Sequence, residues 1–180
     1  MANTNSISFN PAGTASAQFV HAADSASLSV TGDATLECWA YLGTLSSVSG
    51  ANQTFFAKET ANNITFRLFQ STDDHVYLRL SSDGAAATTG TNETALGTGI
   101  WTHIAVAYYA TGGSALFYLN GAVNGTLAVA PNSLFDGTAP LQIGAVSGLV
   151  APAQYADRML MDEVRLWSVT RTAGQILANY

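Results

Sequence analysis

The chain has 180 residues, of which 48% are apolar and only 10% are charged, and its formal net charge is −6. This length fits a single domain, residues 1–180, that can bury a core without metal ions or disulfides as staples. Six basic side chains against twelve acidic ones provide no attraction to phosphates, so nucleic acid is excluded as a partner.

The surface must be covered mainly by Ser, Thr, Asn, Gly and Ala, because charged residues are so few. Such a surface loses little solvation when another surface covers it, which suits a protein that packs into an assembly or works outside a cell. A compositional bias of the lineage would produce the same surface. Cys38 is the only cysteine, and we expect an inert buried thiol that forms no disulfide.

Residues 1–10 lack the basic start and apolar run of a signal peptide, and no run of about 18 apolar residues could insert into a membrane. The charge-poor surface nevertheless leads us to expect a protein of the virion surface or the extracellular space. Either it is trimmed from a longer chain, or it leaves the cell by another route such as virion assembly.

The first clear strand is predicted at residues 34–42, where apolar and mixed side chains alternate. Leu36 and Cys38 lie on the expected core side of this strand. Glu37, Trp39 and Tyr41 lie on its other side.

Residues 64–69 and 75–81 predict a hairpin, because Asp73 and Asp74 between them are turn-forming residues. The inward side of the second strand carries Val76, Leu78 and Leu80. Its outward side carries His75, Tyr77 and Arg79. The stretch 85–90, rich in Ala and Thr, is expected to be an exposed loop.

Residues 101–109 and 115–120 flank a Gly-Gly turn, and Asn120-Gly121 begins another hairpin at once. Tight turns between successive strands predict an antiparallel meander. Later strands are expected at 141–144 and 159–167. Thr172 and Gln175 have the spacing of a capping box, which predicts a short helix, the only segment that looks helical.

These elements predict an all-β fold, a two-sheet antiparallel β-sandwich (jelly roll) with a short C-terminal helix. Alternation along the strands predicts the core residues, which are Leu36, Cys38, Leu68, Val76, Leu78, Ile104, Val106, Leu119, Ile143, Val164 and Leu166.

Six ordered blocks of sequence are similar to those of one family. They are Ser8-Phe-Asn10 with Ala17-Gln-Phe-Val20, Ala34-Thr-Leu-Glu-Cys-Trp-Ala40, Gly99-Ile-Trp-Thr-His-Ile-Ala-Val106, Leu116-Phe-Tyr-Leu-Asn-Gly121, Leu141-Gln-Ile-Gly144 and Met161-Asp-Glu-Val-Arg-Leu-Trp167. In this order they resemble the laminin G-like, concanavalin A-like lectin/glucanase superfamily over essentially the whole chain. The resemblance implies the fold, but not the function, because the same sandwich hosts lectins, glucanases, adhesion modules, pentraxin-like assemblies and virion surface proteins.

We expect that the protein is not an enzyme and has no catalytic residues. Glycosidases need two carboxylates that flank the scissile bond, and the Glu-X-Asp-X-X-Glu string of the superfamily's glucanases does not occur here. The neighbouring acids Asp162 and Glu163 would point to opposite faces of a strand, and Glu37 and Glu59 lie on separate segments. His103 is expected to be a packed or hydrogen-bonded histidine at the edge of the core.

The resemblance implies a structural calcium ion between the opening strand and the closing Asp-Glu-Val-Arg strand. Asp162 is the metal candidate, with carbonyl groups near Asn10 as partners, since calcium prefers oxygen ligands. The alternative is that Asp162 caps turn amides. Apart from calcium, no cofactor is expected.

A glycan site should show aromatic faces for the sugar rings and polar groups for their hydroxyls. The side chains that fall on the non-core sides of their strands and have this character are Trp39, Tyr41, Arg67, Tyr77 and Arg79. The alternative is that these aromatics pack beneath a loop or another subunit.

These observations favour a non-enzymatic surface module. The first expectation is a virion protein, for capsid decoration or attachment, that forms a homo-oligomer or docks on a shell-protein partner. The alternative is a lectin-like carbohydrate-binding module of a secreted or cell-surface protein, with a glycan as its ligand. Insertion into a membrane is not expected.

Overall fold

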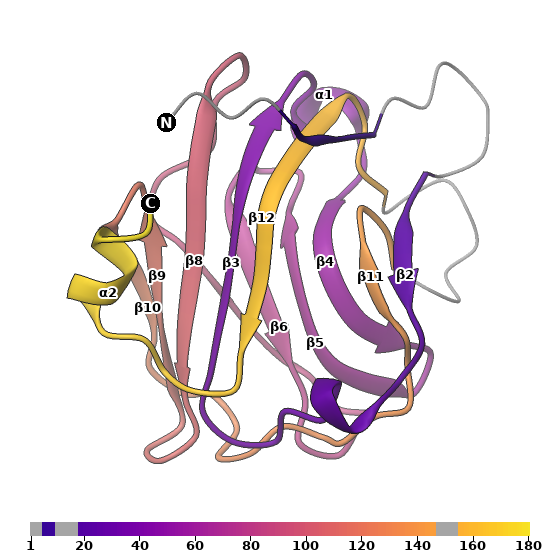
Figure 1. The fold of residues 1–180 in the computed structure, drawn as a ribbon, viewed down its shortest axis with the longest axis vertical. Coiled ribbons are helices and arrows are strands. Elements are labelled where there is room, and N and C mark those ends of the chain that lie inside the picture. Colours follow the sequence, from indigo (N-terminus) through magenta and orange to yellow (C-terminus); the bar gives the residue numbers. More distant parts are fainter. Residues whose placement is uncertain (1–4, 10–17, 147–154) are drawn as a thin grey trace.

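The computed structural model describes residues 5–9, 18–146 and 155–180. Two six-stranded sheets pack face to face (Figure 1). Sheet A has the strand order β1-β12-β3-β8-β9-β10, and sheet B has the order β2-β11-β4-β5-β6-β7. Neighbouring strands run antiparallel in both sheets. The predicted sandwich is therefore confirmed.

The strands of sheet A are β1 (Ile7–Phe9), β3 (Ala34–Leu42), β8 (Trp101–Tyr109), β9 (Ser114–Leu119), β10 (Ala122–Leu127) and β12 (Met159–Trp167). The strands of sheet B are β2 (Val20–Ala22), β4 (Gln53–Thr60), β5 (Asn63–Gln70), β6 (Val76–Leu80), β7 (Thr88–Thr91) and β11 (Leu141–Ile143). The helical segments are η1 (Ala26–Leu28), α1 (Ser46–Ser49) and α2 (Ala173–Leu177).

The predicted hairpins are confirmed, because β5 pairs with β6, and β9 pairs with both β8 and β10. Asn120 has φ 50° and Gly121 has φ 77°, as a turn with two left-handed central residues requires. Asp83 accepts the backbone N–H groups of Ala85 and Ala86 at 2.8 Å, so it is a turn residue.

Two sequence predictions need correction, and the opening motifs are placed by the structure. The stretch 85–90 is not a loop throughout, because β7 begins at Thr88 and pairs with β6. Helical structure also occurs in η1 and α1, not only at the C-terminal end. The two opening motifs contribute β1 and β2, which lie in different sheets and pair with β12 and β11. Asn10 and Ala17 of these motifs lie outside the described residues.

The core lies between the inward faces of the two sheets. Seven of the predicted core residues have relative exposures of 0–1%, namely Leu36, Cys38, Leu68, Val76, Leu78, Ile104 and Val106. The other four are partly buried against them, namely Leu119, Ile143, Val164 and Leu166. Burial raises the pKa of the Cys38 thiol, which fits the expected inert cysteine.

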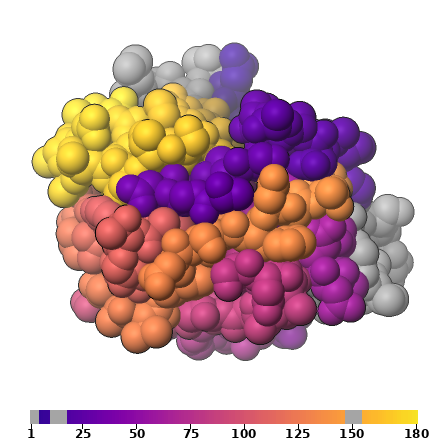
Figure 2. Space-filling view, turned by 90° about the horizontal axis from the view of Figure 1, so that it is seen from below, coloured from indigo at the N-terminus to yellow at the C-terminus, as the bar shows by residue number. Residues whose placement is uncertain are grey.

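One end of the sandwich is closed by two segments that are far apart in sequence. Figure 2 shows the segment before β3, in indigo, beside the segment before β11, in orange, and the Leu134 N–H donates to the Thr31 carbonyl at 2.8 Å. Lys58 is fully buried near this closure, and its Nζ lies 2.8 Å from Asp24 Oδ1. The single lysine of the chain is thus used in the fold.

The C-terminal helix α2 begins with the predicted capping box. Gln175 N donates to Thr172 Oγ1 at 3.3 Å, and Thr172 N donates to Gln175 Oε1 at 2.9 Å. Ile176 packs on Ala105, Ala107 and Tyr118, so α2 covers part of the outward face of sheet A (Figure 1). None of the helices within the described ranges is long and apolar enough to cross a membrane.

Candidate functional site

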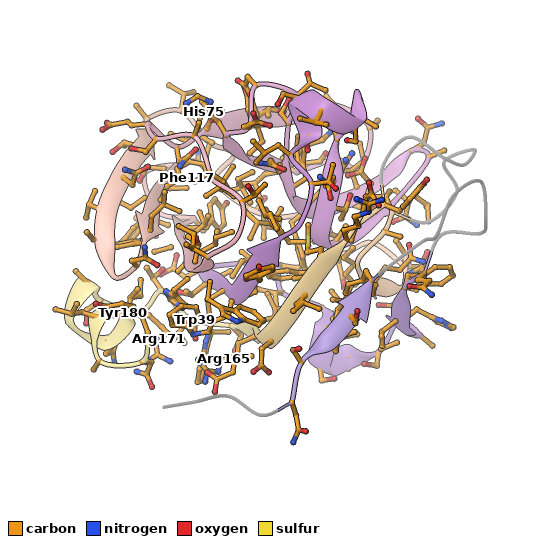
Figure 3. The ribbon with its side chains drawn as sticks, turned by 90° about the horizontal axis from the view of Figure 1, so that it is seen from above. Trp39, His75, Phe117, Arg165, Arg171 and Tyr180 are labelled. Atoms are coloured by element: carbon orange, nitrogen blue, oxygen red, sulfur yellow. The ribbon has the colours of Figure 1, made fainter. Side chains whose placement is uncertain are left out.

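The five residues predicted to bind a ligand lie on opposite faces of the sandwich. Trp39 and Tyr41 of β3 point outward from sheet A, whereas Arg67, Tyr77 and Arg79 point outward from sheet B. Figure 3 shows Trp39 on one side of the molecule and His75, just before β6, on the other. The expectation of one shared face is therefore corrected. Alternation shows which side of a strand avoids the core, but not which sheet the strand joins.

A fully buried carboxylate, Glu37, lies at the centre of the outward face of sheet A. Its Oε1 accepts from Trp167 Nε1 at 2.8 Å and from Arg165 Nη1 at 3.3 Å, and Arg171 Nη1 lies 3.8 Å away. The three donors come from β12 and the segment after it. Because a buried carboxylate is tolerated only when it is paired, this network ties the C-terminal part of the chain to sheet A.

His103 lies beside this network and is also buried. Its Nε2 is 3.7 Å from Glu37 Oε2, and neither atom has a hydrogen-bond partner in the structure. Burial lowers the pKa of His103 to about 4, although Glu37 acts in the opposite direction. The imidazole is therefore neutral at neutral pH, and its buried position fits the structural role expected from the sequence.

Tyr180 covers this part of sheet A. Its ring stacks on Trp39 with the centroids 6.2 Å apart, and it lies 6.2 Å from the ring of His103. Figure 3 shows Trp39, Arg165, Arg171 and Tyr180 gathered on one side of the molecule. The aromatic face of Trp39 is thus occupied by a residue of the chain itself.

A smaller aromatic patch on sheet A remains exposed. Tyr41 and Trp101 are Cα partners in β3 and β8, and their ring centroids are 5.9 Å apart. Trp101 is 37% exposed and the preceding Ile100 is 59% exposed. This patch is apolar and carries few hydrogen-bonding groups, so it suits contact with a protein better than contact with a sugar.

The outward face of sheet B carries a row of residues that are Cα partners across neighbouring strands. The row runs from β2 to β7 through His21, Gln142, Ala57, Arg67, Arg79 and Thr89. The two end residues are exposed, Arg79 is half-buried, and the middle residues are buried. Exposure therefore falls from both ends of this row, called here the sheet B row, toward its middle.

Polar atoms in and beside the sheet B row lack partners. Arg67 Nη2 and Gln142 Oε1 are buried in the row without a hydrogen bond. Glu59 Oε2, next to the row, is also buried without a hydrogen bond, although Glu59 Oε1 accepts from Arg79 Nη1 at 2.7 Å. Burial raises the pKa of Glu59, against the opposing effect of Arg79 and Arg67. One buried donor and two buried acceptors on this face thus have no partner within the protein.

Two aromatic rings lie alongside the sheet B row. The guanidinium of Arg67 lies 4.2 Å above the ring centroid of Phe69, and the ring of Phe69 is 5.5 Å from that of Tyr77. Tyr77 is half-buried, and its hydroxyl donates to Asp73 Oδ2 at 2.8 Å, which raises the pKa of the phenol. Tyr77 therefore has a fixed orientation beside the polar groups.

The three helical segments of the described chain lie away from the sheet B row. Helix α2 packs on sheet A, and α1 and η1 lie at the two ends of the sandwich (Figure 1). The segment before β11 contacts one margin of the face, where Thr65 Oγ1 donates to the Phe135 carbonyl at 2.9 Å.

The carboxylates do not form a hydrolytic pair. Glu37 and Glu59 lie on the outward faces of different sheets, so the core separates them and they cannot flank one glycosidic bond. At the neighbouring acids, Glu163 has φ 48° in a bulge of β12 and forms an ion pair with Arg165. The expected simple alternation of Asp162 and Glu163 is thus interrupted by the bulge.

Asp162 has the chemistry of a metal ligand at one oxygen. Its Oδ1 accepts from Glu163 N at 2.7 Å, which matches the capping alternative, but its Oδ2 is buried and unpaired. No three His, Cys, Asp or Glu side chains within residues 5–9, 18–146 and 155–180 come together as metal ligands. Asp162 therefore fits a calcium ion only if carbonyl or water oxygens supply the other ligands.

Sequence reasoning missed Glu59, Phe69 and Gln142. Glu59 lies in β4 and Gln142 lies in β11, and the sequence of neither strand shows a clear apolar alternation. Phe69 reads as a core residue when considered alone. Only the register of β11, β4 and β5 brings these side chains together, and no local signal in the sequence shows that register.

The laminin G-like family model described as the concanavalin A-like lectin/glucanases superfamily matches residues 13–177. The comparison with curated proteins returns no match.

Several solved structures share the fold at low sequence identity. The binding domain of Paraclostridial mosquitocidal protein 1 has a TM-score of 0.74 at 11% identity, over 97% of this chain and 42% of that one. A Bacteroides ovatus protein named for a proposed carbohydrate-binding role has a TM-score of 0.65 at 19% identity, over 88% of this chain and 43% of that one. The heptameric SAP-like pentraxin of Limulus polyphemus has a TM-score of 0.67 at 17% identity, over 96% of this chain and 79% of that one. The chain thus spans less than half the length of the first two.

Proposed function

Since the chain belongs to the concanavalin A-like lectin/glucanases superfamily, we propose that it is a non-enzymatic module that binds carbohydrate on the outward face of sheet B. One observation carries this proposal. On the outward face of sheet B, Arg67 Nη2 in β5 is a buried donor without a partner, Gln142 Oε1 in β11 and Glu59 Oε2 in β4 are buried acceptors without partners, and Tyr77 lies on the neighbouring β6. Sugar hydroxyls both donate and accept hydrogen bonds, so a sugar can satisfy all three atoms.

The solved structures support a binding role in general terms. Those with similar folds include the binding domain of a toxin and a protein named for carbohydrate binding. Their identities of 11% and 19% establish the fold alone. The choice of carbohydrate as the ligand therefore rests on the side chains of sheet B in this chain.

A glycan array tests the proposal directly. The protein should be retained on at least one group of oligosaccharides, and Tyr77→Ala should abolish this retention while its melting curve stays cooperative. Tyr41→Ala is the matched control, because it removes the same ring from the outward face of sheet A. The proposal is wrong if no oligosaccharide is retained, or if Tyr41→Ala rather than Tyr77→Ala abolishes retention.

A second candidate function is assembly, as a virion decoration or attachment protein that forms a homo-oligomer or docks on a shell protein. The exposed patch of Tyr41, Ile100 and Trp101 favours it, on a chain with only 10% charged residues. Light scattering tests this candidate. A trimer or larger ring supports assembly, whereas a strictly monomeric protein that is retained on glycans contradicts it.

A further inference from the structure

The outward face of sheet B places two arginines side by side on an acidic protein. The chain has only six Lys and Arg residues against twelve acids, yet Arg67 and Arg79 are Cα partners on this face. The carboxylate of Glu59 lies beside these arginines, and its Oε1 already accepts from Arg79 Nη1 at 2.7 Å. Within the group formed by Arg67, Arg79 and Glu59, two guanidinium groups and one carboxylate leave an excess of one positive charge; the other carboxylate near the site is Asp73, which accepts from the Tyr77 hydroxyl.

Arg67 is held with part of its guanidinium unused. Its Nε donates to Thr54 Oγ1 at 3.2 Å, and the planar group lies 4.2 Å above the ring of Phe69. The residue is only 3% exposed, and Nη2 has no partner. A buried charged donor without an acceptor is costly, more so than a neutral one. A ligand that brings an anionic acceptor would remove this cost.

The excess of one charge favours a ligand group with one negative charge. A sugar carboxylate carries one charge, is planar, and offers two oxygens that match the fork of a guanidinium. A dianionic phosphate would instead leave a negative charge next to Glu59. The unpaired Oε2 of Glu59 and Oε1 of Gln142 can accept from hydroxyls of the same sugar.

We propose that the carbohydrate bound on sheet B is an acidic sugar of the uronate class, with its carboxylate on Arg67 and Arg79. Glu59 and Gln142 accept from its hydroxyls, and Tyr77 lies against its ring. This inference rests on the proposed function, because it names the ligand class of the same site.

Calorimetric titration with matched ligand pairs tests the inference. The probes are oligomers of galacturonate, glucuronate and mannuronate, each compared with its own methyl ester, which keeps the size and hydroxyls but removes the charge. We expect at least one free acid to bind about tenfold or more tightly than its ester, since a charge-assisted bidentate pair is lost in the ester. The difference should shrink in high salt.

Two arginine variants locate the carboxylate. Arg67→Lys keeps the charge but loses the planar fork, and Arg79→Gln removes the half-buried charge; each should weaken binding of the free acid about tenfold and weaken binding of the ester less, so that the preference for the free acid falls. Arg158→Gln is the control, because Arg158 is exposed and lies outside the sheet B row. If Arg67→Lys does not fold, as seen by circular dichroism, Arg79→Gln decides the question.

The outcomes separate this inference from the proposed function. If the neutral esters bind as tightly as the free acids, the acidic-sugar inference is overturned, while carbohydrate binding stands. If only sulfated or phosphorylated sugars bind, the uronate class is likewise overturned. If no saccharide binds, acidic or neutral, the proposed function fails and the inference fails with it.

Discussion

The outward faces of the two sheets carry similar side chains that are used in different ways. On sheet A, Glu37 accepts from Arg165 and Trp167, which the chain itself supplies, and Tyr180 covers Trp39. On sheet B, Arg67, Gln142 and Glu59 each keep an unpaired buried atom. On sheet A these residue types are covered by the C-terminal segment, whereas on sheet B we propose that they bind a ligand.

The C-terminal segment of the chain covers the outward face of sheet A, and this cover explains the difference. The segment after β12 places Arg171 near Glu37, and α2 packs on the neighbouring part of sheet A. Two of the unpaired atoms there, His103 Nε2 and Glu37 Oε2, are 3.7 Å apart, whereas His103 Nδ1 and Arg171 Nε are also buried without a hydrogen bond. Among the described residues, no helix covers sheet B in the same way. Arginine and carboxylate side chains therefore indicate binding only where the chain leaves them uncovered.

The largest expected effect comes from the buried carboxylate of sheet A. Glu37→Gln should lower the free energy of unfolding by about 3–5 kcal/mol, because Arg165 and Arg171 lose their buried counter-charge. Glu59→Gln, the matched change on sheet B, should cost less than about 2 kcal/mol, because its partner Arg79 is half-exposed. Urea denaturation followed by circular dichroism measures both. Equal losses would break the distinction between the two faces.

His103 should make stability depend on pH. Its pKa is lowered to about 4 in the folded state, so the unfolded state binds the proton more readily. The contribution of neutral His103 to the free energy of unfolding is therefore fully present above pH ~6.5. It is lost progressively as the pH falls to about 4, by an amount on the order of 3 kcal/mol. His103→Gln should flatten this part of the pH profile relative to wild type. An unchanged difference between the two proteins over this range would contradict the neutral buried imidazole.

Calcium should have a smaller effect on stability. We propose that Asp162 Oδ2 is a ligand, so calcium at several times its dissociation constant should stabilise the native state by about 1 kcal/mol. A chelator should reverse the shift in melting temperature, and Asp162→Asn should abolish it. Melting curves that do not respond to calcium in a metal-free preparation would remove this proposal.

The smallest effect is expected at the exposed patch of sheet A. Trp101→Ser should change the free energy of unfolding by less than about 1 kcal/mol, because the ring is already partly in solvent. Its affinity for glycans should equal that of wild type. If the protein forms oligomers through this patch, the variant should be monomeric by light scattering. A loss of glycan affinity in Trp101→Ser would place the ligand on the wrong face for this account.

The sequence predicted the fold well where local signals agree. Apolar alternation in β3, β6 and β8, together with Asn120-Gly121, is enough to define strands and a hairpin. The predictions failed where polar residues replace the alternation. Thr88–Thr91 forms an edge strand without apolar residues, and β4 buries Lys58 and Glu59 in a strand. Tertiary partners, which no local pattern shows, decide both cases.

The candidate site was predicted only in part. Arg67, Tyr77 and Arg79 were identified because alternation places them away from the core, and the structure brings these three together. Trp39 and Tyr41 satisfied the same criterion but belong to the other sheet. Gln142 became visible only through the pairing of β11 with β4, which joins segments more than 80 residues apart in the chain. Sheet membership and long-range register are properties of the whole fold.

The central claim is that a ligand binds sheet B and not sheet A. The most direct test is a titration of 15N-labelled protein with a retained oligosaccharide, followed by two-dimensional NMR. We predict that the shifted amides belong to β4, β5, β6 and β11, around the sheet B row. Shifts confined to β3, β8 and β12 would contradict the claim and move the binding site to the face that Tyr180 covers.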